Sequence, residues 1–354
     1  MCSTSLKAHA LDTLEQLDQS PHTAHSEPFL ERVHPAQVTL QKRARAKSFS
    51  FGLSKALYAE ACKQKEADPE KGGQLKRAYG RGLDCTGQIV QEADGSQKAH
   101  YCGNRWCMVC NRIRTARAIQ AYEPALEAWG DDAYFVTLTV ENCTGDELRS
   151  TIRGMTAAFT SCKRTIKRTH GLLLEAIRKL EVTYNWKTDT YHPHFHIIVN
   201  GEAQAEALKH YWLQRSERRA VHAAQDVRPL DKGGKKEIFK YFTKLLADGK
   251  EGKKADPKSL NVIFEQIKGL RTYQPIGFKI KDYAAPVDPD APLETVNTTK
   301  AYKRSDETVV WTWMQDYFDW VDWDTGECLT DYTPTDKWRD LCQRLEPDPV
   351  LTDI

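Results

Sequence analysis

The sequence contains no apolar run long enough to span a membrane. Its first residues, 1–20, carry scattered charges and lack the apolar stretch of a secretion signal, so we expect a cytoplasmic protein without membrane contact. No internal repeat is visible, which excludes a solenoid built from repeats. A disulfide framework is also not expected without secretion, so the ten cysteines need another explanation.

Charge is nearly balanced over the whole chain, with 51 basic and 49 acidic residues, but it is unevenly distributed. From Asp282 to the C-terminus there are 17 acidic and 6 basic residues, which leaves 32 acidic and 45 basic residues before that point. A basic body followed by an acidic tail favours a polyanionic partner. The tail also holds five of the nine tryptophans, enough for a small packed unit or a contact surface.

The middle of the chain alternates between strand and helix patterns. Apolar, β-branched segments predict strands at 133–141, 180–186, 191–200 and 221–230. Segments with helical periodicity predict helices at 145–170, 203–219 and 235–246. The short polar segment 187–190 suits a hairpin turn. We therefore predict an α+β fold with a central, mainly antiparallel sheet flanked by helices.

Three histidines alternate in the segment Tyr191–Asn200. Side chains two residues apart share a face of a strand, so His192, His194 and His196 project together while the apolar residues between them point into the core. Imidazoles at this spacing can bind one divalent cation. His194 and His196 are the stronger candidates, because Pro193 is expected to mark the strand start and leave His192 at its edge.

Two histidines do not complete the coordination shell of a cation, so a carboxylate from a neighbouring strand is expected. Glu181 shares one face of the preceding strand with Thr183 and Asn185. Because a hairpin would set Glu181 beside the histidine pair, Glu181 is the candidate third ligand. Surface histidines on an edge strand are the alternative explanation, but three of them alternating on an apolar strand favour metal binding.

The predicted helix 235–246 has a polar face that contains Glu237, Tyr241 and Lys244. A tyrosine hydroxyl with its ordinary pKa of about 10 is a poor nucleophile. An adjacent cation or a metal-polarised phosphate would make attack by Tyr241 feasible. Taken alone, this residue would more often be an ordinary half-buried helix residue.

Together these segments resemble the His-hydrophobic-His (HUH) endonuclease superfamily, and most closely the replication initiator (Rep) family of rolling-circle plasmids. Phe135–Val140 is similar to the first strand motif, His192–His196 to the metal motif, and Glu237 with Tyr241 to the catalytic helix. A glutamate one turn before a single tyrosine resembles the branch that uses one tyrosine and one glutamate. The resemblance covers about residues 133–282, for which it implies the HUH nickase fold.

The resemblance implies a bacterial plasmid replication initiator, a site-specific single-strand DNA endonuclease and ligase. Tyr241 would attack a phosphodiester at the double-strand origin, form a link to the 5′ phosphate and free a 3′ hydroxyl primer. Glu237 would activate water at termination. Lys240 and Lys244 would hold flanking phosphates, although a solvated surface explains both lysines equally well.

The resemblance also implies cofactors and partners. Mg²⁺ or Mn²⁺ would be held at His194 and His196, with Glu181 and His192 as further candidate ligands, and would stabilise charge on the phosphate. The expected partner is plasmid origin DNA, single-stranded at the nick and duplex nearby. A host helicase is a further expected partner.

A second metal site is predicted from cysteine spacing. Cys107 and Cys110 form a C-x-x-C knuckle, and Cys102 adds a third thiol within nine residues. Cys85 is the predicted fourth ligand, with His100 as the alternative, in a tetrahedral site for structural Zn²⁺. Catalytic redox chemistry is disfavoured because thioredoxin-like motifs do not bring a third cysteine so close. Basic residues near this module are expected to contact DNA: Arg112, Arg114 and Arg117.

Four regions are predicted along the chain. Residues 1–78 form an N-terminal extension, partly disordered or helical, in which Asp68–Gly73 is expected to be a linker. Residues 79–118 form the cysteine-rich zinc module, residues 130–282 the endonuclease domain, and residues 283–354 an acidic, tryptophan-rich C-terminal region.

Three other functions fit parts of this pattern. An HUH transposase would share His194, His196 and Tyr241 but would join DNA ends instead of priming replication. A conjugative relaxase is disfavoured, because its tyrosine usually precedes its histidines. A zinc-dependent DNA-binding regulator would use the cysteine module without any catalysis, and a nicking assay would distinguish it from the enzyme.

Overall fold

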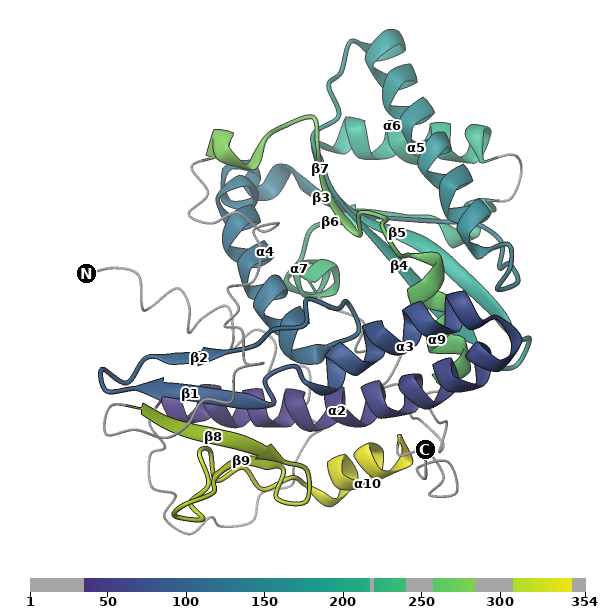
Figure 1. Ribbon diagram of the computed structural model, residues 1–354. Coiled ribbons are helices and arrows are strands. Elements are labelled where there is room, and N and C mark those ends of the chain that lie inside the picture. The colour runs from purple at the N-terminus through teal and green to yellow at the C-terminus, as the bar shows by residue number, and fades with distance from the viewer. Residues whose placement is uncertain (1–34, 217–219, 240–256, 284–307, 346–354) are drawn as a thin grey trace. The chain divides into compact units, whose positions relative to one another are not determined.

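The computed structural model describes residues 35–216, 220–239, 257–283 and 308–345 (Figure 1). Its helices are α2 (Pro35–Ala67), α3 (Pro69–Leu83), α4 (Met108–Trp129), α5 (Leu148–His170), α6 (Glu202–Arg215), α7 (Lys232–Phe239), α9 (Pro257–Gln266) and α10 (Asp336–Arg344). Its strands are β1 (Gln88–Glu92), β2 (Gln97–Ala99), β3 (Ala133–Thr139), β4 (Ala176–Asn185), β5 (Thr190–Asn200), β6 (Asp226–Pro229), β7 (Tyr273–Ile276), β8 (Thr308–Met314) and β9 (Asp319–Asp322).

These elements belong to two compact units. We call the first the histidine unit; it contains the described parts of residues 115–239 and 262–283. The second, the cysteine unit, contains the described parts of residues 35–114, 254–261 and 308–345. No helix in the described ranges is both long and apolar enough to cross a membrane.

The histidine unit is built on a five-stranded sheet with the order β6-β3-β5-β4-β7, in which every neighbouring pair is antiparallel. The α+β fold with a mainly antiparallel sheet is thus confirmed. β4 and β5 form the expected hairpin, whose turn includes Asp189 at a φ of 51°, a left-handed conformation that aspartate tolerates better than most residues. β4 begins four residues earlier than the predicted strand, at Ala176.

Helices cover both faces of this sheet, as Figure 1 shows with α5 and α6 above it and α7 and α4 below. On the first face, Phe195 of β5 packs against Phe159 of α5 and Trp212 of α6, with ring centroids 6.0 Å apart in both pairs. On the second face, Ile238 and Phe239 of α7 join a buried cluster with apolar residues of the sheet. The central strands β3, β4 and β5 therefore bury side chains on both of their faces, which explains their many apolar residues.

The cysteine unit begins with the helical pair α2 and α3. The predicted linker at Asp68–Gly73 is wrong, because these residues form the junction and the first turns of α3. The Asp68 carboxylate accepts a hydrogen bond from the Lys71 backbone N–H, and Pro69 occupies the first turn, where no N–H is needed. Proline and aspartate thus start a helix here instead of interrupting the chain.

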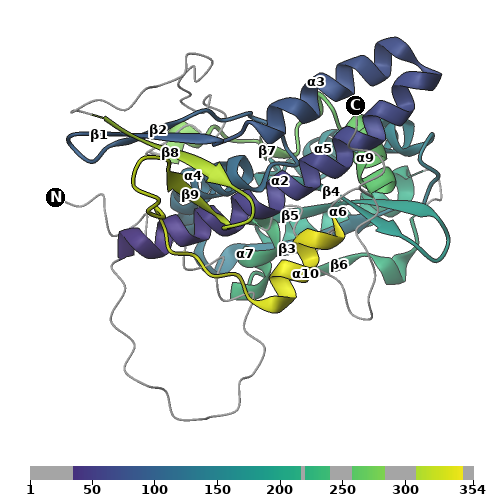
Figure 2. The same ribbon diagram turned by 60° about the horizontal axis from the view of Figure 1, so that its bottom comes forward.

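A four-stranded sheet with the order β2-β1-β8-β9 completes the cysteine unit. β8 and β9 come from the tryptophan-rich tail, and β8 pairs antiparallel with β1, with Ile89 opposite Trp311 (Figure 2). Trp313 and Trp320 pack edge to face at 4.8 Å in a core with Ile89. Part of the tail therefore forms the same sheet as the segment that precedes the cysteine knuckle.

Candidate metal centres

The register of the histidine unit aligns polar side chains from three adjacent strands on one face of the sheet. Glu181 of β4 lies directly opposite His194 of β5, and Thr139 of β3 lies opposite His194 on the other side. His196 is flanked in the same way by Lys179 and Thr137. Because alternate residues share a face, the sheet gathers these groups in two neighbouring rows.

Glu181, His194 and His196 offer ligand atoms that all lie within 4.8 Å of one another, and all three residues are buried. The Nδ1 atom of His194 lies 3.1 Å from the carbonyl oxygen of His192, and that of His196 lies 3.4 Å from the Thr137 hydroxyl. A ring nitrogen that donates to such an oxygen leaves the Nε2 lone pair of the same ring available to a cation.

The carboxylate of Glu181 is suited to complete this site. Its buried Oε2 atom lies 3.6 Å from His196 Nε2 and forms an ion pair with Lys179 Nζ at 3.1 Å. Burial alone would raise the pKa of Glu181, but the charges of Lys179, His194 and His196 lower it below its ordinary value. The group is therefore ionised at neutral pH, and two imidazoles with a carboxylate suit a divalent cation.

His192 takes a different position from the other two histidines. Its Nε2 atom contacts the Thr139 hydroxyl, and its ring stacks on that of His194 at 5.1 Å. Burial and the neighbouring His194 lower the pKa of His192 to about 4, so this ring is neutral at physiological pH. The structure thus brings the side chains of Glu181, His194 and His196 together, whereas the ring of His192 points toward Thr139.

Helix α7 lies on the same face of the sheet as the histidines. Its Ile238 packs with Phe135 and Ile198, which alternate in step with Thr137 and His196 on their strands. The hydroxyl of Tyr273 also donates to the backbone carbonyl of Ile238. α7 includes Glu237 as a backbone position, whereas Lys240, Tyr241 and Lys244 lie outside the described residues.

The cysteine unit brings together all four predicted thiols, from Cys85, Cys102, Cys107 and Cys110, within 4.8 Å of one another. The Cys85 Sγ atom lies 3.5 Å from Cys107 Sγ and 3.6 Å from Cys110 Sγ, and the Cys102 Sγ atom lies 3.7 Å from Cys110 Sγ. A disulfide would need about 2 Å. Four thiolates around Zn²⁺, each about 2.3 Å from the ion in a tetrahedron, place sulfurs roughly 3.8 Å apart, so this cluster fits zinc.

A buried lysine lies beside the thiol cluster. Lys47 of α2 has no solvent exposure, and its ammonium donates to the carbonyl oxygens of Leu83 at 2.8 Å and Cys85 at 2.6 Å. Burial lowers the pKa of Lys47, and the neighbouring thiols oppose that shift. Hydrogen bonds from the other three thiols lower the pKa of Cys107, which favours a thiolate there. A positive charge at Lys47 would partly offset a negatively charged thiolate cluster.

The three arginines predicted to bind DNA all lie on α4 and are half-buried. Arg114 donates a 2.6 Å hydrogen bond to the Gly103 carbonyl and so supports the loop that carries Cys102. Arg112 and Arg117 each have contacts within the protein as well. DNA binding by Arg112, Arg114 and Arg117 remains a prediction.

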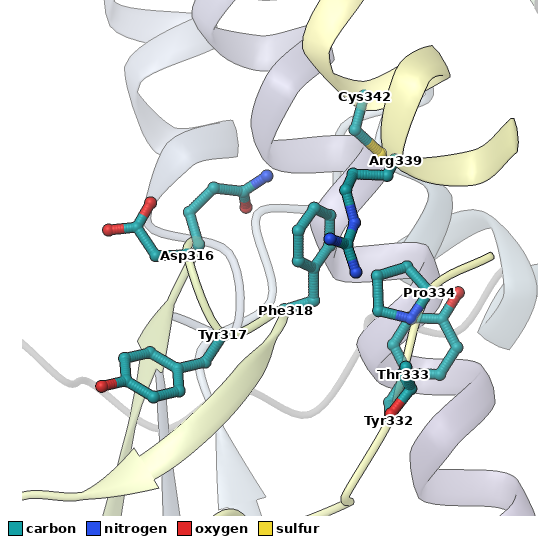
Figure 3. Close-up of a pocket in the computed structure, with 9 residues that line it drawn as sticks. Asp316, Tyr317, Phe318, Tyr332, Thr333, Pro334, Arg339 and Cys342 are labelled. Carbon is teal, nitrogen blue, oxygen red and sulfur yellow. The ribbon is translucent and has the colours of Figure 1, made fainter. Parts of the chain in front are cut away.

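A pocket in the cysteine unit lies between the β8–β9 turn and α10. Figure 3 shows Arg339 extending from α10 toward the ring of Phe318 and Pro334. Asp316 and Tyr317 also line the pocket. Its lining residues belong to neither metal-binding cluster, and we assign it no chemistry.

Sequence reasoning missed three groups that support the two centres: Lys179, Thr137 and Lys47. Lys179 precedes Glu181 by two residues, so alternation alone could have placed it on the ligand face. Thr137 lies within the first strand motif, but only the pairing of β3 with β5 sets it beside His196. Lys47 carries no signal in its local sequence, because its neighbours at Leu83 and Cys85 are distant along the chain.

Residues 95–321, more than half of the chain, match the sequence profile of a family described as Replication protein. "Protein rep" from Streptococcus pneumoniae serotype 2 is 33% identical over 120 residues, which cover 32% of this chain and 37% of that protein. "Protein rep" from Staphylococcus aureus is 32% identical over 127 residues, which cover 34% of this chain and 54% of that protein.

A third relative, "Protein rep" from Bacillus sp, is 35% identical over 108 residues, which cover 29% of this chain and 34% of that protein. The chain thus spans between 34% and 54% of the length of these curated relatives. No solved structure matches it significantly.

Proposed function

Because this chain belongs to the Replication protein family of rolling-circle plasmids, we propose that it initiates replication by nicking one strand of its plasmid's origin DNA. In this proposal it is a metal-dependent, HUH-type endonuclease and ligase of the branch with one tyrosine and one glutamate, and it acts in the bacterial cytoplasm. The observation that carries the proposal is the convergence of Glu181, His194 and His196 on the sheet face where α7 docks.

The protein's own residues would prepare this centre before DNA arrives. Bonds to the carbonyl of His192 and the hydroxyl of Thr137 hold the two imidazole rings so that each presents Nε2. Lys179 keeps Glu181 ionised in its buried position. A divalent cation bound here, Mg²⁺ or Mn²⁺, would polarise a phosphodiester and stabilise the negative charge that develops on it.

Tyr241 is the proposed nucleophile. Its phenolic O–H would lose its proton, its oxygen would form a bond to the phosphorus, and the bond from phosphorus to the 3′ oxygen would break. The 3′ oxygen would take up one proton to become the hydroxyl primer, so protons balance in this step. Tyr241 follows Phe239 by two residues, roughly 7 Å of chain at most, and Phe239 is anchored on the metal-bearing face. Lys240 and Lys244 are proposed to hold neighbouring phosphates.

Glu237 is proposed to act at termination. With one tyrosine in this helix, release of the enzyme needs a different nucleophile, and water activated by a carboxylate can supply it. The proton of that water would pass to Glu237 while the bond from phosphorus to the Tyr241 oxygen breaks. The 5′ phosphate would then be free, and the tyrosine would regain its proton.

The Cys85, Cys102, Cys107 and Cys110 cluster is proposed to hold structural Zn²⁺, because four thiolates close the coordination shell. Arg112, Arg114 and Arg117 are proposed DNA contacts beside it, and His192 is a further candidate ligand of the histidine centre. Origin DNA, single-stranded at the nick and duplex nearby, is the proposed substrate. A host helicase is the proposed partner in strand separation.

The first prediction tests the nucleophile on supercoiled DNA of the replicon that encodes the chain, with Mn²⁺ added. Wild-type protein should produce open circles and a covalent protein–DNA adduct, and Tyr241→Phe should produce neither, because only the attacking oxygen is removed. The matched control is Tyr211→Phe, whose hydroxyl contacts His170 at 3.0 Å in α5, away from the histidine face. In a replication reaction that also contains DNA polymerase, helicase and nucleotides, Glu237→Ala should still form the adduct but leave multimers instead of unit-length circles.

Several results would contradict this assignment. An adduct that maps to Tyr211 or Tyr273 would move the nucleophile to another element. Wild-type yields of unit-length circles from Glu237→Ala would remove the termination role of the glutamate. Site-specific DNA binding without any nicking by the wild type would favour a zinc-dependent regulator, and joining of two DNA ends without primer extension would favour a transposase.

A further inference from the structure

Helix α5 covers the sheet face opposite the histidines, and its two sides differ sharply in character. Its large apolar side chains are all buried: Leu148, Ile152, Met155, Phe159 and Ile166. Phe159 packs on Phe195 at the centre of the sheet. The apolar side thus fixes the helix firmly, and the outer side is available for another role.

The outer side of α5 concentrates positive charge. Its cations are Arg149, Arg153, Lys163, Arg164, Lys167 and Arg168. At about 100° per residue, the first five of these fall within roughly 100° of arc, and they extend over about 27 Å of helix. Residues 148–174 contain no aspartate or glutamate. One face of the helix therefore carries a basic stripe in two groups about 15 Å apart, Arg149 with Arg153 and Lys163 with Arg164 and Lys167, which we call the α5 stripe.

The protein does not neutralise this stripe within the part of the chain that the structure describes. No ion pair among those residues involves Arg153, Lys163, Arg164 or Lys167. Arg149 donates to the carbonyl oxygens of Gln266 at 2.9 Å and Lys268 at 3.1 Å, which are neutral acceptors. The helix dipole favours cations only in the last turn, so it accounts for Lys167 but not for Arg153 or Lys163.

The side chains on the α5 stripe indicate which class of partner it would bind. Between the cations lie the small side chains of Thr156, Ala157 and Thr160, which allow close approach of a polyanion. The stripe has no exposed aromatic ring on which the bases of a single strand could stack. It also lacks exposed large apolar side chains that could enter a membrane. Two groups of cations on one straight helix can instead contact phosphates at two places along the backbone of a duplex.

We propose that the α5 stripe is a second DNA-binding surface of the histidine unit, which holds the phosphate backbone of duplex DNA on the face opposite the metal centre. The proposal rests on the proposed function only in taking DNA as the polyanion. It separates two tasks within one unit: the histidine face would act on the exposed strand, and the α5 stripe would hold neighbouring duplex without reading its sequence.

The second prediction tests the stripe by binding alone. The variant Arg153→Gln/Arg164→Gln/Lys167→Gln removes three exposed charges, and Lys187→Gln/Lys279→Gln/Lys281→Gln removes three exposed charges elsewhere in the same unit. Fluorescence anisotropy with a random-sequence duplex of about 25 base pairs should show that the stripe variant binds at least about tenfold more weakly than wild type. The slope of log affinity against log salt concentration should be smaller in magnitude by about 2 to 3. The control variant should lose less than about threefold in duplex affinity. The affinity of the stripe variant for single-stranded oligo-dT should change less than about twofold.

A charge-conserving variant and a second ligand complete the design. Arg153→Lys/Arg164→Lys should bind duplex nearly as well as wild type, which separates charge from misfolding. Equal losses in the stripe and control variants, or unchanged duplex affinity in the stripe variant, would overturn the proposal. So would a loss confined to vesicles containing phosphatidylserine. Duplex binding is measured without cleavage, so its outcome does not depend on nicking. If the nickase proposal failed but Tyr241→Phe protein still bound duplex through the stripe, the stripe proposal would hold.

Discussion

At the scale of single residues, the histidine centre depends on a carboxylate that the protein has buried and kept charged. Glu181 has its pKa lowered by Lys179 and two histidines although burial acts in the opposite direction. A carboxylate with a lowered pKa contributes stability that is present above its ordinary value of 4.5 and is lost as the pH falls through the lowered pKa. At neutral pH this residue is therefore an anion, as its proposed role as a metal ligand requires.

The third prediction follows from that charge. Glu181→Gln keeps the size of the side chain but replaces the anionic oxygen by a neutral amide, so Mn²⁺ affinity should fall at least about tenfold. Electron paramagnetic resonance titration of free Mn²⁺ measures it directly. The control is Glu141→Gln, an exposed carboxylate just beyond β3. Equal Mn²⁺ affinity in Glu181→Gln and wild type would remove Glu181 from the ligand set.

At the scale of elements, α7 connects the histidine-bearing face of the sheet to the proposed nucleophile. Ile238 has no solvent exposure and packs among residues of β3, β4 and β5. The carbonyl of Ile238 also accepts a hydrogen bond from Tyr273 of β7. These contacts fix the last described residues of α7 on the histidine-bearing face, two residues before Tyr241 in the sequence.

The fourth prediction concerns this docking. Ile238→Ala should cost about 3 kcal/mol of unfolding free energy by leaving a cavity, and should also reduce nicking more than tenfold while Mn²⁺ affinity stays unchanged. Chemical denaturation and the nicking assay provide the two measurements. Leu208→Ala is the matched control, because Leu208 is equally buried in α6 on the opposite face. If both variants lose nicking in equal measure, global destabilisation explains the effect and α7 has no special positioning role.

Elements also differ in how well they could be predicted from their sequences. The β4–β5 hairpin follows from two alternating segments around a polar turn, and the structure confirms it. The predicted linker at Asp68–Gly73 failed because the same residues that interrupt a chain also start a helix: Asp68 caps α3 and Pro69 occupies its first turn. Composition does not decide between these outcomes; the conformation of the flanking chain does.

At the scale of the whole molecule, two proposed metal centres belong to two different compact units. The cysteine unit assembles its cluster from Cys85 before β1 and from three cysteines after β2. Closing such a cluster orders the loops on both sides of it. The histidine centre instead lies on strands that a continuous core already holds, so the two ions should have different consequences for folding.

The fifth prediction concerns removal of zinc. Chelation, confirmed by elemental analysis, should accelerate hydrogen exchange in β1, β2 and the first turns of α4 and leave β3, β4 and β5 protected. Cys107→Ser should reproduce this pattern, and Cys62→Ser, which alters a cysteine outside the cluster, should not. Freshly purified protein without zinc, or full protection of β1 after zinc loss, would contradict the structural role.

The sequence by itself determined the features that depend on local periodicity. Alternation on one strand aligns His194 and His196, because side chains in a strand repeat every two residues whatever the rest of the fold does. The C-x-x-C knuckle likewise brings two thiols together through a few residues of chain. Tyr241 was predicted from its motif and lies outside the described residues, so its role remains a proposal.

Only the tertiary structure decided the contacts between distant segments. It pairs β8 with β1, sets Thr137 beside His196, buries Lys47 next to the thiol cluster, and turns the basic side of α5 away from the histidine face. Such contacts depend on which surfaces bury together when the whole chain folds. A residue's neighbours in the sequence carry little information about that choice, because the free energy of packing is shared among segments far apart in the chain.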